Sequence, residues 1–229
     1  MEERKSKNIV ILAAGDFPSH PIPLKALQEA DFVVCCDSAY TQFSIFNFQF
    51  SIPFVVIGDG DSLSEQDKHQ LGDHWIHVAE QDYNDLHKAM YWATRRFQDP
   101  SCKFQILGAT GKREDHTLGN ISYLITFAQE YPGIDLEMLT NHGRFVALTS
   151  TSHLSPFTFH LPSFPHQQVS IFTPDPATAV TSDGLRWPLD NFHAKLWWNA
   201  TLNEALKESF SLSTTGPVIV FQTYDPKPL

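Results

Sequence analysis

Cysteine is scarce in this chain, with three among 229 residues. Cys35 and Cys36 are adjacent and Cys102 is distant, which suits neither a disulfide framework nor a set of metal ligands. We interpret all three as small buried hydrophobic residues. The chain also lacks an apolar run near the roughly 20 residues that span a bilayer, and its charged start, MEERKSK, contains no signal-peptide core. These absences predict a cytoplasmic protein that does not cross a membrane.

Basic residues are few, with 16 Lys and Arg against 26 Asp and Glu and a formal net charge of −10. Contact with a nucleic-acid backbone needs a concentrated Lys and Arg surface, so this balance argues against a nucleic-acid partner. It does not exclude a nucleotide, because nucleotide phosphates can arrive already bound to a divalent metal.

The first half of the chain alternates short apolar runs with helical patterns. The runs are typical of parallel strands buried on both faces, and they are NIVILAAG (8–15), FVVCCD (32–37), FVVIGD (54–59), WIHVAEQ (75–81), FQILGATG (104–111) and IDLEMLTN (134–141). Helices are predicted over 24–30, 85–97 and 115–130. The alternation predicts an α/β domain, a Rossmann-like parallel sheet with helices on both faces.

The second half has a different composition, richer in Pro, Ser, Thr and Phe. Short strand-like runs, such as FTFHLP (157–162), are separated by turns marked by Pro or Gly, a pattern typical of an antiparallel sandwich or jelly roll. LNEALKE (202–208) fits a helical turn or a loop equally well. We therefore predict an α/β domain over residues 1–142 and an all-β domain over 143–229.

Five successive strand ends in the first half finish in Gly, Asp or a basic residue. Asp37 follows the second run, GDGDS (58–62) the third, and QDYND (81–85) the fourth. Ligands of a parallel sheet bind beyond the carboxyl ends of its strands. One acidic strand end is usually only a helix cap, but five along one edge indicate a ligand site.

Asp59 and Asp61 form the sharpest pair at this edge. On an extended chain, residues i and i+2 point the same way, so both carboxylates can face one cation. Hard oxygen ligands with room for water and phosphate suit Mg²⁺ better than Zn²⁺. Asp82 and Asp85 can add to this acidic cluster, although Asn84 or Asp85 is also expected to cap the following helix.

The segment GATGKREDHTLGN (108–120) brings basic residues to the same edge. It is not a Walker A loop, because only two residues separate Gly108 from Gly111, and there is no GxGxxG dinucleotide motif. What remains is a glycine turn with two cations before a helix N-terminus, where the helix dipole favours anions. Asp115 is placed to cap that helix. A basic side opposite an acidic side favours phosphoryl transfer.

Taken together, these motifs resemble the thiamine pyrophosphokinase (thiamine diphosphokinase) family. The resemblance rests on CCDSAY, GDGDS, EQDYNDLHKA, GATGKREDHTLGN and TSDGLRWPL, which occur in the family's order from about residue 9 to 221. It implies an enzyme that transfers the pyrophosphoryl group of ATP to the hydroxyl of thiamine with Mg²⁺ and releases AMP. It also implies a homodimer whose thiamine site lies between the α/β domain of one subunit and the β domain of the other.

The resemblance also implies roles for individual residues. The metal ligands would be Asp59, Asp61 and Asp82, and the catalytic residues Asp85, Gln81 and Asp82. ATP would be bound by Asp37, Lys88, Arg113, Asp115, His116 and Asn120. Thiamine would be contacted by Ser182, Trp187 and Asn84. Without the family, a Trp packed in a core or turn is the better interpretation of Trp187. Two departures from the family are Ser38-Ala39-Tyr40, where Gly-Gly-Ala is usual, and Lys112, where a second Gly is usual.

Two other functions fit parts of the sequence. Paired Asp residues at strand ends also serve metal-dependent nucleotide phosphohydrolases, which release phosphate from ATP without thiamine. A non-catalytic thiamine or nucleotide sensor of the same fold is expected to have lost part of its acidic cluster. In this chain all of the acids are present, at positions 59, 61, 82 and 85.

Overall fold

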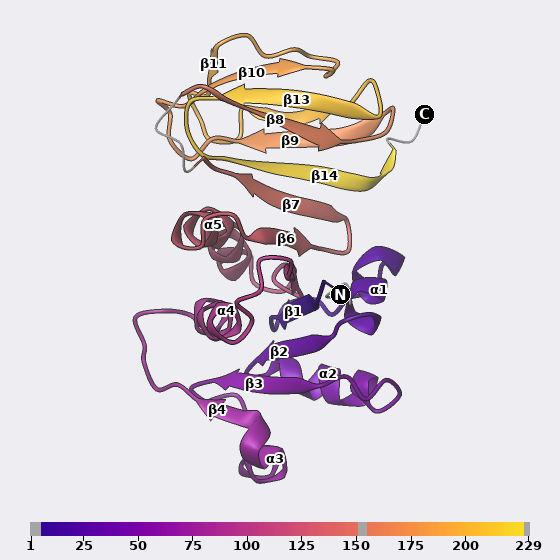
Figure 1. Cartoon of the computed structure of the whole chain (residues 1–229), viewed down its shortest axis with the longest axis vertical. Helices are drawn as coiled ribbons and strands as arrows, with labels where there is room; N and C mark the ends of the chain where they lie inside the picture. Colours follow the sequence, from indigo (N-terminus) through magenta and orange to yellow (C-terminus); the bar gives the residue numbers. More distant parts are fainter. Residues whose placement is uncertain (1–5, 151–154, 227–229) are drawn as a thin grey trace, which may run out of the picture. The chain divides into compact units, whose positions relative to one another are not determined.

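The computed structural model describes residues 6–150 and 155–226 (Figure 1). The chain divides into two compact units. The first comprises Met1–Tyr123 and Gly133–Asn141, and the second comprises Leu124–Pro132 and His142–Leu229. Positions 1–5 and 227–229, at the outer ends of the two predicted domains, lie outside the described residues.

The first unit is built on a parallel sheet. Its strands, in sheet order, are β6 (Asp135–Leu139), β5 (Lys103–Leu107), β1 (Asn8–Leu12), β2 (Phe32–Cys36), β3 (Phe54–Gly58) and β4 (Trp75–His77). The helices along the chain are α1 (Pro21–Gln28), α2 (Ala39–Asn47), α3 (Glu65–Leu71), the short 3-10 helix η1 (Gly72–His74), α4 (Asp85–Arg96) and α5 (Glu114–Glu130). The prediction of an α/β fold with a parallel sheet is confirmed.

Both faces of this sheet are covered, which explains the nearly continuous apolar runs of the strands. On one face, Val10 and Leu12 of β1 pack with Leu27 of α1 and Phe43 of α2. On the other, α4 lies against β1, β2 and β3. Figure 1 shows α4 on one side of these strands and α1 and α2 on the opposite side.

The second unit contains antiparallel strands in two groups. One group pairs in the order β12 (Ala200–Glu204), β9 (Gln167–Phe172), β14 (Val218–Pro226) and β7 (Gly143–Leu148). The other pairs in the order β11 (Phe192–His193), β10 (Ala179–Asp183), β13 (Ser209–Thr214) and β8 (Phe157–Pro162). Val169, Ile171, Val180 and Leu212 share one buried core, so the predicted antiparallel sandwich is confirmed.

Several predicted element limits are wrong for identifiable reasons. α1 begins at Pro21 rather than after Pro23, because proline is tolerated in the first turn of a helix. β4 ends at His77 rather than near residue 81. The segment 202–208 is neither a helical turn nor a plain loop, since it contains the end of β12 and a bridge from Ala205 to Leu185.

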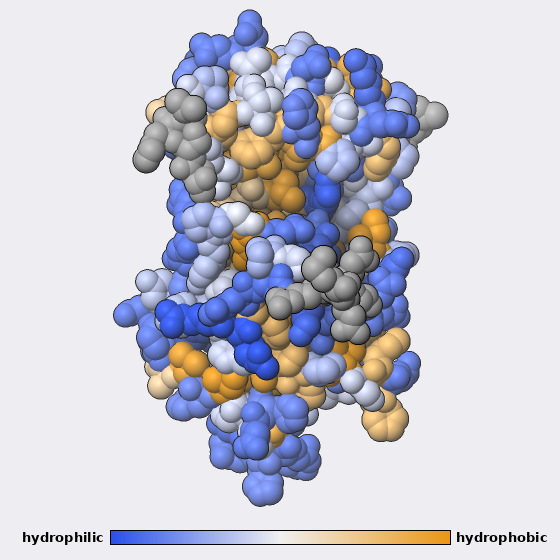
Figure 2. Space-filling view, viewed as in Figure 1, coloured by the Kyte–Doolittle hydropathy of each residue, from blue (hydrophilic) through white to orange (hydrophobic). Residues whose placement is uncertain are grey.

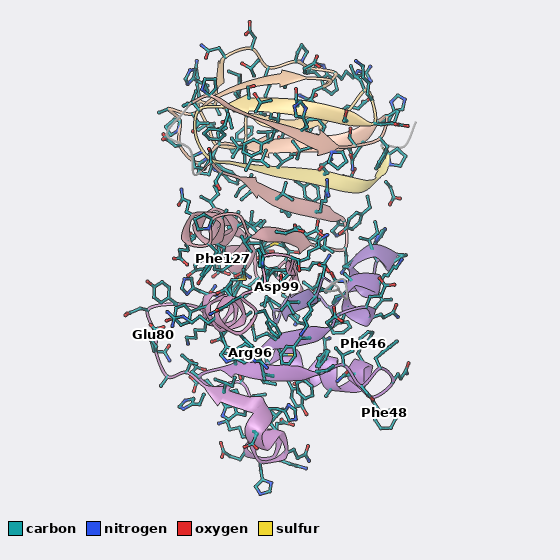
Figure 3. All side chains as sticks on the ribbon, in the orientation of Figure 1. Phe46, Phe48, Glu80, Arg96, Asp99 and Phe127 are labelled. Atoms are coloured by element: carbon teal, nitrogen blue, oxygen red, sulfur yellow. The ribbon has the colours of Figure 1, made fainter. Side chains whose placement is uncertain are left out.

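Helices α2 and α3 were not predicted from the sequence. α3 is short and mostly polar, with Leu71 as its buried residue, so it has no apolar stripe. α2 is rich in aromatic residues, and Ile45 is 74% exposed just before its end. Phe48, labelled in Figure 3, projects from the end of α2 and is 90% exposed. Figure 2 shows orange side chains near α2 and blue ones around α3.

Within residues 6–150 and 155–226, no helix is both long enough and apolar enough to cross a membrane.

Candidate functional site

Two predicted acids, Asp37 after β2 and Asp85 at the start of α4, lie beside the end of β3. Gly58 ends β3, and a Cβ at this position would lie 2.8 Å from the Cβ of Asp37 and 3.4 Å from the Cγ of Asp85. Any side chain at position 58 would therefore collide with Asp37. The glycine allows the two carboxyl groups to approach the end of the strand from different elements.

Asp37 is the most buried acid of this group, with 4% of its surface exposed. Its Oδ2 accepts a hydrogen bond of 3.2 Å from the backbone N–H of Ser62, while its Oδ1 is buried without a hydrogen-bond partner. Burial raises the pKa of Asp37, and the carboxylates of Asp59 and Asp61 also raise it, against the lowering effect of Ser62. A buried carboxylate oxygen without a donor is a position that a cation would satisfy.

Asp59 is held by two donors. The backbone N–H of Asp61 donates to its Oδ1 at 3.1 Å, and Gln81 Nε2 donates to its Oδ2 at 3.0 Å. These hydrogen bonds lower the pKa of Asp59, so it is ionised at neutral pH. The premise that Asp59 and Asp61 lie on an extended strand is wrong, because β3 ends at Gly58 and Gly60 has a φ of +82°. The two residues instead form a turn closed by the side chain of Asp59.

Helix α4 begins at the same edge and carries Asp85 and Lys88. Asn84 caps the helix, since its side chain accepts a hydrogen bond of 3.0 Å from the N–H of His87. Lys88 Nζ lies 3.4 Å from Asp85 Oδ1, and the Lys88 side chain is only 5% exposed. Burial raises the pKa of Asp85, although Lys88 opposes this shift. The ammonium group of Lys88 is therefore nearly buried and lies among the acidic residues.

Asp82 lies apart from these contacts. It is exposed, and its backbone N–H donates to the carboxylate of Glu80 on the loop between β4 and α4, where Figure 3 labels Glu80. Within the described residues, no three His, Cys, Asp or Glu side chains converge closely enough to hold a metal ion.

The glycine turn of 108–111 is fixed against the end of β1. The N–H groups of Ala13, Gly15 and Asp16 donate to the carbonyls of Leu107, Gly108 and Thr110. A Cβ at Gly111 would lie 2.1 Å from Asp16 Oδ2, so only glycine fits there. Lys112 has a φ of +53° and donates from Nζ to the carbonyl of Ala14 at 2.7 Å. The loops after β1 and β5 thus form one interlocked structure.

Arg113 and Asp115 form an exposed ion pair at the start of α5. Arg113 Nη2 lies 2.5 Å from Asp115 Oδ2, with 69% and 62% of the two side chains exposed. Arg113, together with the N–H of His116, lowers the pKa of Asp115 to about 2. Asp115 lies inside the first turn of α5, which begins at Glu114, so the expectation that it caps this helix is wrong.

Asn120 connects the glycine turn with the start of α4. Its Nδ2 donates to the carbonyl of Ala109 at 2.9 Å, and its Oδ1 accepts from Asn84 Nδ2 at 3.2 Å. Asn84 directly precedes Asp85. The structure thereby brings two of the predicted site residues, Asn84 and Asn120, into direct contact across 36 positions of sequence.

Ser182 and Trp187 lie in the second unit. The N–H and Oγ of Ser182 both bond to the backbone of Leu189, at 2.9 and 2.8 Å. Trp187 is 51% exposed, so of the interpretation of a Trp packed in a core or a turn, the core part is wrong. Sequence reasoning missed the residues that hold this tryptophan, Asn203 and the pair formed by Arg186 and Glu204, because only their side-chain contacts identify them.

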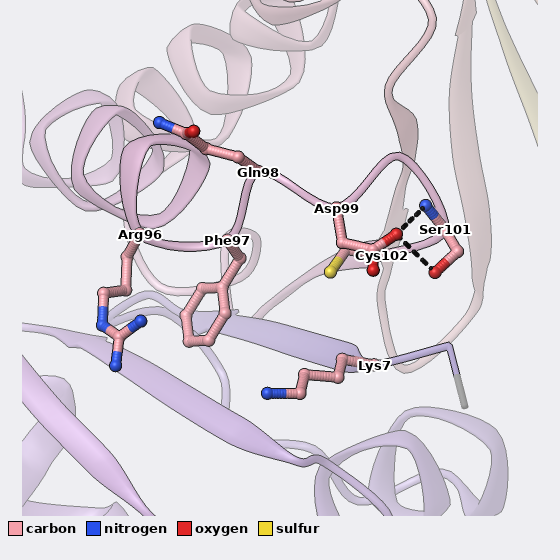
Figure 4. Close-up of a pocket in the computed structure, with 7 residues that line it drawn as sticks. All are labelled: Lys7, Arg96, Phe97, Gln98, Asp99, Ser101 and Cys102. Carbon is pink, nitrogen blue, oxygen red and sulfur yellow. Dashed lines mark hydrogen bonds between the residues drawn. The ribbon is translucent and has the colours of Figure 1, made fainter. Parts of the chain in front are cut away.

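A separate cavity of about 520 Å³ opens elsewhere in the first unit (Figure 4). It is lined by Lys7, Arg96, Phe97, Gln98, Asp99, Ser101 and Cys102. Lys7 and Cys102 directly precede the amino ends of β1 and β5, so this cavity lies away from the carboxyl ends of the strands. It contains none of the predicted site residues.

Comparison with family models gives two matches in chain order. Residues 24–136 match the model described as thiamin pyrophosphokinase, catalytic domain, and residues 143–221 match thiamin pyrophosphokinase, substrate-binding domain. Together these matches account for most of the chain.

Curated relatives and solved structures carry the same description. The chain is similar to thiamine pyrophosphokinase of Bacillus subtilis, 29% identical over 63% of this chain and 65% of that protein. It is also similar to thiamine pyrophosphokinase 1 of rice, 30% identical over 61% of this chain and 53% of that protein. The aligned stretches thus span about half to two thirds of these relatives.

The solved structures extend the similarity of fold over nearly the whole chain. Thiamin pyrophosphokinase from Candida albicans has a TM-score of 0.79 at 16% identity, covering 96% of this chain and 90% of that one. The Bacillus subtilis structure has a TM-score of 0.71 at 23% identity, covering 96% and 100%. At these identities the structures establish the fold.

Proposed function

Because the chain belongs to the thiamin pyrophosphokinase family, we propose that it transfers the pyrophosphoryl group of ATP to the hydroxyl of thiamine. The products are thiamine diphosphate and AMP. The observation that supports this proposal most directly is the meeting of Asp37, Asp59, Asp85 and Lys88 at the carboxyl edge of the parallel sheet. This is the edge where ligands of such sheets bind.

In the proposed reaction, the hydroxyl oxygen of thiamine attacks the β-phosphorus of ATP. The bond from that phosphorus to the oxygen bridging the α- and β-phosphates breaks, and AMP leaves with the electron pair. The hydroxyl proton passes to the carboxylate of Asp85, which we assign as the group that orients the hydroxyl and accepts its proton. Positioning and charge neutralisation supply most of the rate in such transfers.

The chain also fits a divalent cation, which we propose to be Mg²⁺. Asp59 and Asp61 would hold it, assisted by Asp82 from the loop between β4 and α4, and Gln81 would keep Asp59 oriented through its 3.0 Å hydrogen bond. The donor-free Oδ1 of Asp37 supports a cation at this place. When bound, Mg²⁺ would neutralise phosphate charge and hold the phosphates in line.

The ATP phosphates would meet the basic part of the site. Lys88 supplies an ammonium group that is almost shielded from water, and Arg113 supplies an exposed guanidinium group oriented by Asp115. His116 lies one residue further along the first turn of α5, where backbone N–H groups favour anions. Asn120 supports this side by fixing Ala109 in the glycine turn.

We further propose a division of labour between the two predicted domains. Residues 1–142 bind ATP and the metal, and residues 143–229 supply the thiamine contacts Ser182 and Trp187, with Asn84 added from the start of α4. Flat pyrimidine and cationic thiazolium rings suit an exposed indole face. The family resemblance supports a cytoplasmic homodimer with the thiamine site between subunits.

A product assay tests the proposal. The purified protein is incubated with ATP, Mg²⁺ and thiamine, and AMP, thiamine diphosphate and free phosphate are quantified. Equal amounts of AMP and thiamine diphosphate support the kinase. Phosphate release that does not depend on thiamine would instead identify a phosphohydrolase, and binding of thiamine without any product would identify a sensor.

A further inference from the structure

The segment that carries Trp187 is held along its length by the end of β12. Leu206 donates from its N–H to the carbonyl of Gly184 at 3.0 Å, and Arg186 donates from its N–H to the carbonyl of Glu204 at 2.8 Å. A bridge between Leu185 and Ala205 lies between these two hydrogen bonds. The backbone leading to Trp187 is therefore an antiparallel extension of the strand rather than a free loop.

A β-bulge in β12 orients the residues that face this segment. The register with β9 shifts between Ala200 and Asn203, and Leu202 has a φ of +61°. Ser170 Oγ accepts a hydrogen bond of 3.1 Å from the N–H of Leu202 and so stabilises the bulge. Beyond it, Asn203 and Glu204 are both buried, although consecutive strand residues normally point to opposite faces.

Asn203 uses its buried side chain to hold both polar groups of the Trp187 backbone. Its Oδ1 accepts from the N–H of Trp187 at 3.1 Å, and its Nδ2 donates to the carbonyl of Trp187 at 2.7 Å. Asn203 is 5% exposed, so these hydrogen bonds are shielded from water. A side chain that satisfies both groups of one residue fixes the position from which the indole projects.

Arg186 covers one face of the same indole. Its guanidinium carbon lies 5.3 Å from the centre of the Trp187 ring, and its Nη1 lies 3.1 Å from Glu204 Oε2. Glu204 also contacts His166 Nδ1 at 2.8 Å. The carboxylate balances the charge of Arg186, while the indole remains half exposed.

We infer that Asn203 is a positioning residue that presents the uncovered face of Trp187 to a flat heteroaromatic ring of the substrate. This inference rests on the proposed function, since it places thiamine on that face. With Arg186 on one side, the ring can stack on the other side alone. Because Glu204 neutralises Arg186, a cationic ring is not repelled.

A double-mutant cycle tests this inference in the full-length protein. Asn203→Ala is expected to raise the KM for thiamine about tenfold, as the loss of buried hydrogen bonds would, and to change the KM for ATP less than about twofold. In a Trp187→Ala background, Asn203→Ala is expected to cause no further rise in the KM for thiamine, because its effect passes through the indole. Asn199→Ala is the matched control, since the side chain of Asn199 accepts a local hydrogen bond from the N–H of Leu196 and does not contact Trp187 within the described residues.

Two results would overturn the inference. One is a rise in the KM for thiamine caused by Asn203→Ala that is as large in the Trp187→Ala background as in the wild type. The other is an equal rise in the KM for ATP and in the KM for thiamine together with a lowered Tm, which would indicate a general structural role. If the Asn203→Ala protein is unstable, Asn203→Asp replaces it, because the Asp keeps the acceptor for the Trp187 N–H and removes the donor. This variant must then show the same selective rise in the KM for thiamine. Absence of thiamine diphosphate formation by the wild-type protein would refute the proposed function itself.

Discussion

The side chains of Asn84 and Asn120 are joined by a hydrogen bond of 3.2 Å that links the cap of α4 to α5. Asn120 also holds the carbonyl of Ala109, so one carboxamide connects the acidic helix start with the glycine turn. The start of α4 and the glycine turn are therefore joined through the side chain of Asn120.

Replacing Asn120 by Ala should loosen the glycine turn while leaving the acidic residues in place. We expect the KM for ATP to rise about five- to tenfold and the free energy of unfolding to fall by about 1 kcal/mol, as the loss of such hydrogen bonds predicts. Steady-state kinetics and urea unfolding measure the two effects. Ser122→Ala is the control, because the hydroxyl of Ser122 donates to the carbonyl of Leu118 within α5 itself. A variant with an unchanged KM for ATP would show that the link has no role in binding.

Lys112 occupies a backbone conformation that favours glycine, with a φ of +53°. We expect Lys112→Gly to be more stable than Lys112→Ala by about 1 kcal/mol, because alanine keeps the left-handed strain and glycine relieves it. Both variants lose the hydrogen bond to Ala14. The difference between their free energies of unfolding therefore reports the backbone strain at position 112 alone. At Lys207, whose φ is not positive, the order should reverse, with the Gly variant less stable than the Ala variant, because glycine loses more backbone entropy on folding. Equal stabilities of the two Lys112 variants would contradict this explanation.

Glu204 should make the stability of the protein depend on pH. His166, followed by Arg186, holds the pKa of Glu204 below its ordinary value of 4.5, against the opposing effect of burial. Because the folded-state pKa is the lower one, this contribution is complete above about pH 4.5 and is lost as the pH falls through the folded-state value. Urea unfolding between pH 7 and pH 3 should show a gap in the free energy of unfolding between wild type and Glu204→Gln. The gap should close as the pH falls through the folded-state pKa of Glu204. Glu208→Gln, on an exposed residue, should show no such gap.

Asp61→Ala should separate catalysis from folding. Asp61 is exposed, and its backbone N–H, which substitution retains, makes the hydrogen bond to Asp59. We expect kcat to fall at least about a hundredfold if Asp61 helps to hold Mg²⁺, with the free energy of unfolding within about 0.5 kcal/mol of wild type. Asp73→Ala, an exposed acid on η1, is the matched control. Wild-type AMP release by Asp61→Ala would refute its assignment to the metal.

The sequence predicted the parallel strands and the acids that follow them, because buried parallel strands leave a direct signal. An apolar run such as FVVIG ends abruptly where Gly58 and Asp59 begin, so the strand end and its acids are visible together. α3 lacked such a signal, since most of its residues are polar and Leu71 is its one buried residue.

The contacts within the site were beyond sequence reasoning. The bond between Asn84 and Asn120 depends on how two helices pack, and the turn that closes on Asp59 depends on the positive φ of Gly60. The burial of both Asn203 and Glu204 follows from the bulge at Leu202, which has no marker such as glycine in the sequence. Lys112 likewise has a left-handed backbone conformation that the sequence does not indicate, because the residue at this position is lysine and not glycine.

The central claim is tested most directly with ATP labelled at the β-phosphorus. Incubated with the protein, Mg²⁺ and thiamine, the label should pass entirely into thiamine diphosphate, and the AMP formed in equal amount should be unlabelled. Label that stays in ADP, or that appears as free phosphate or pyrophosphate without thiamine diphosphate, would contradict pyrophosphoryl transfer by this chain.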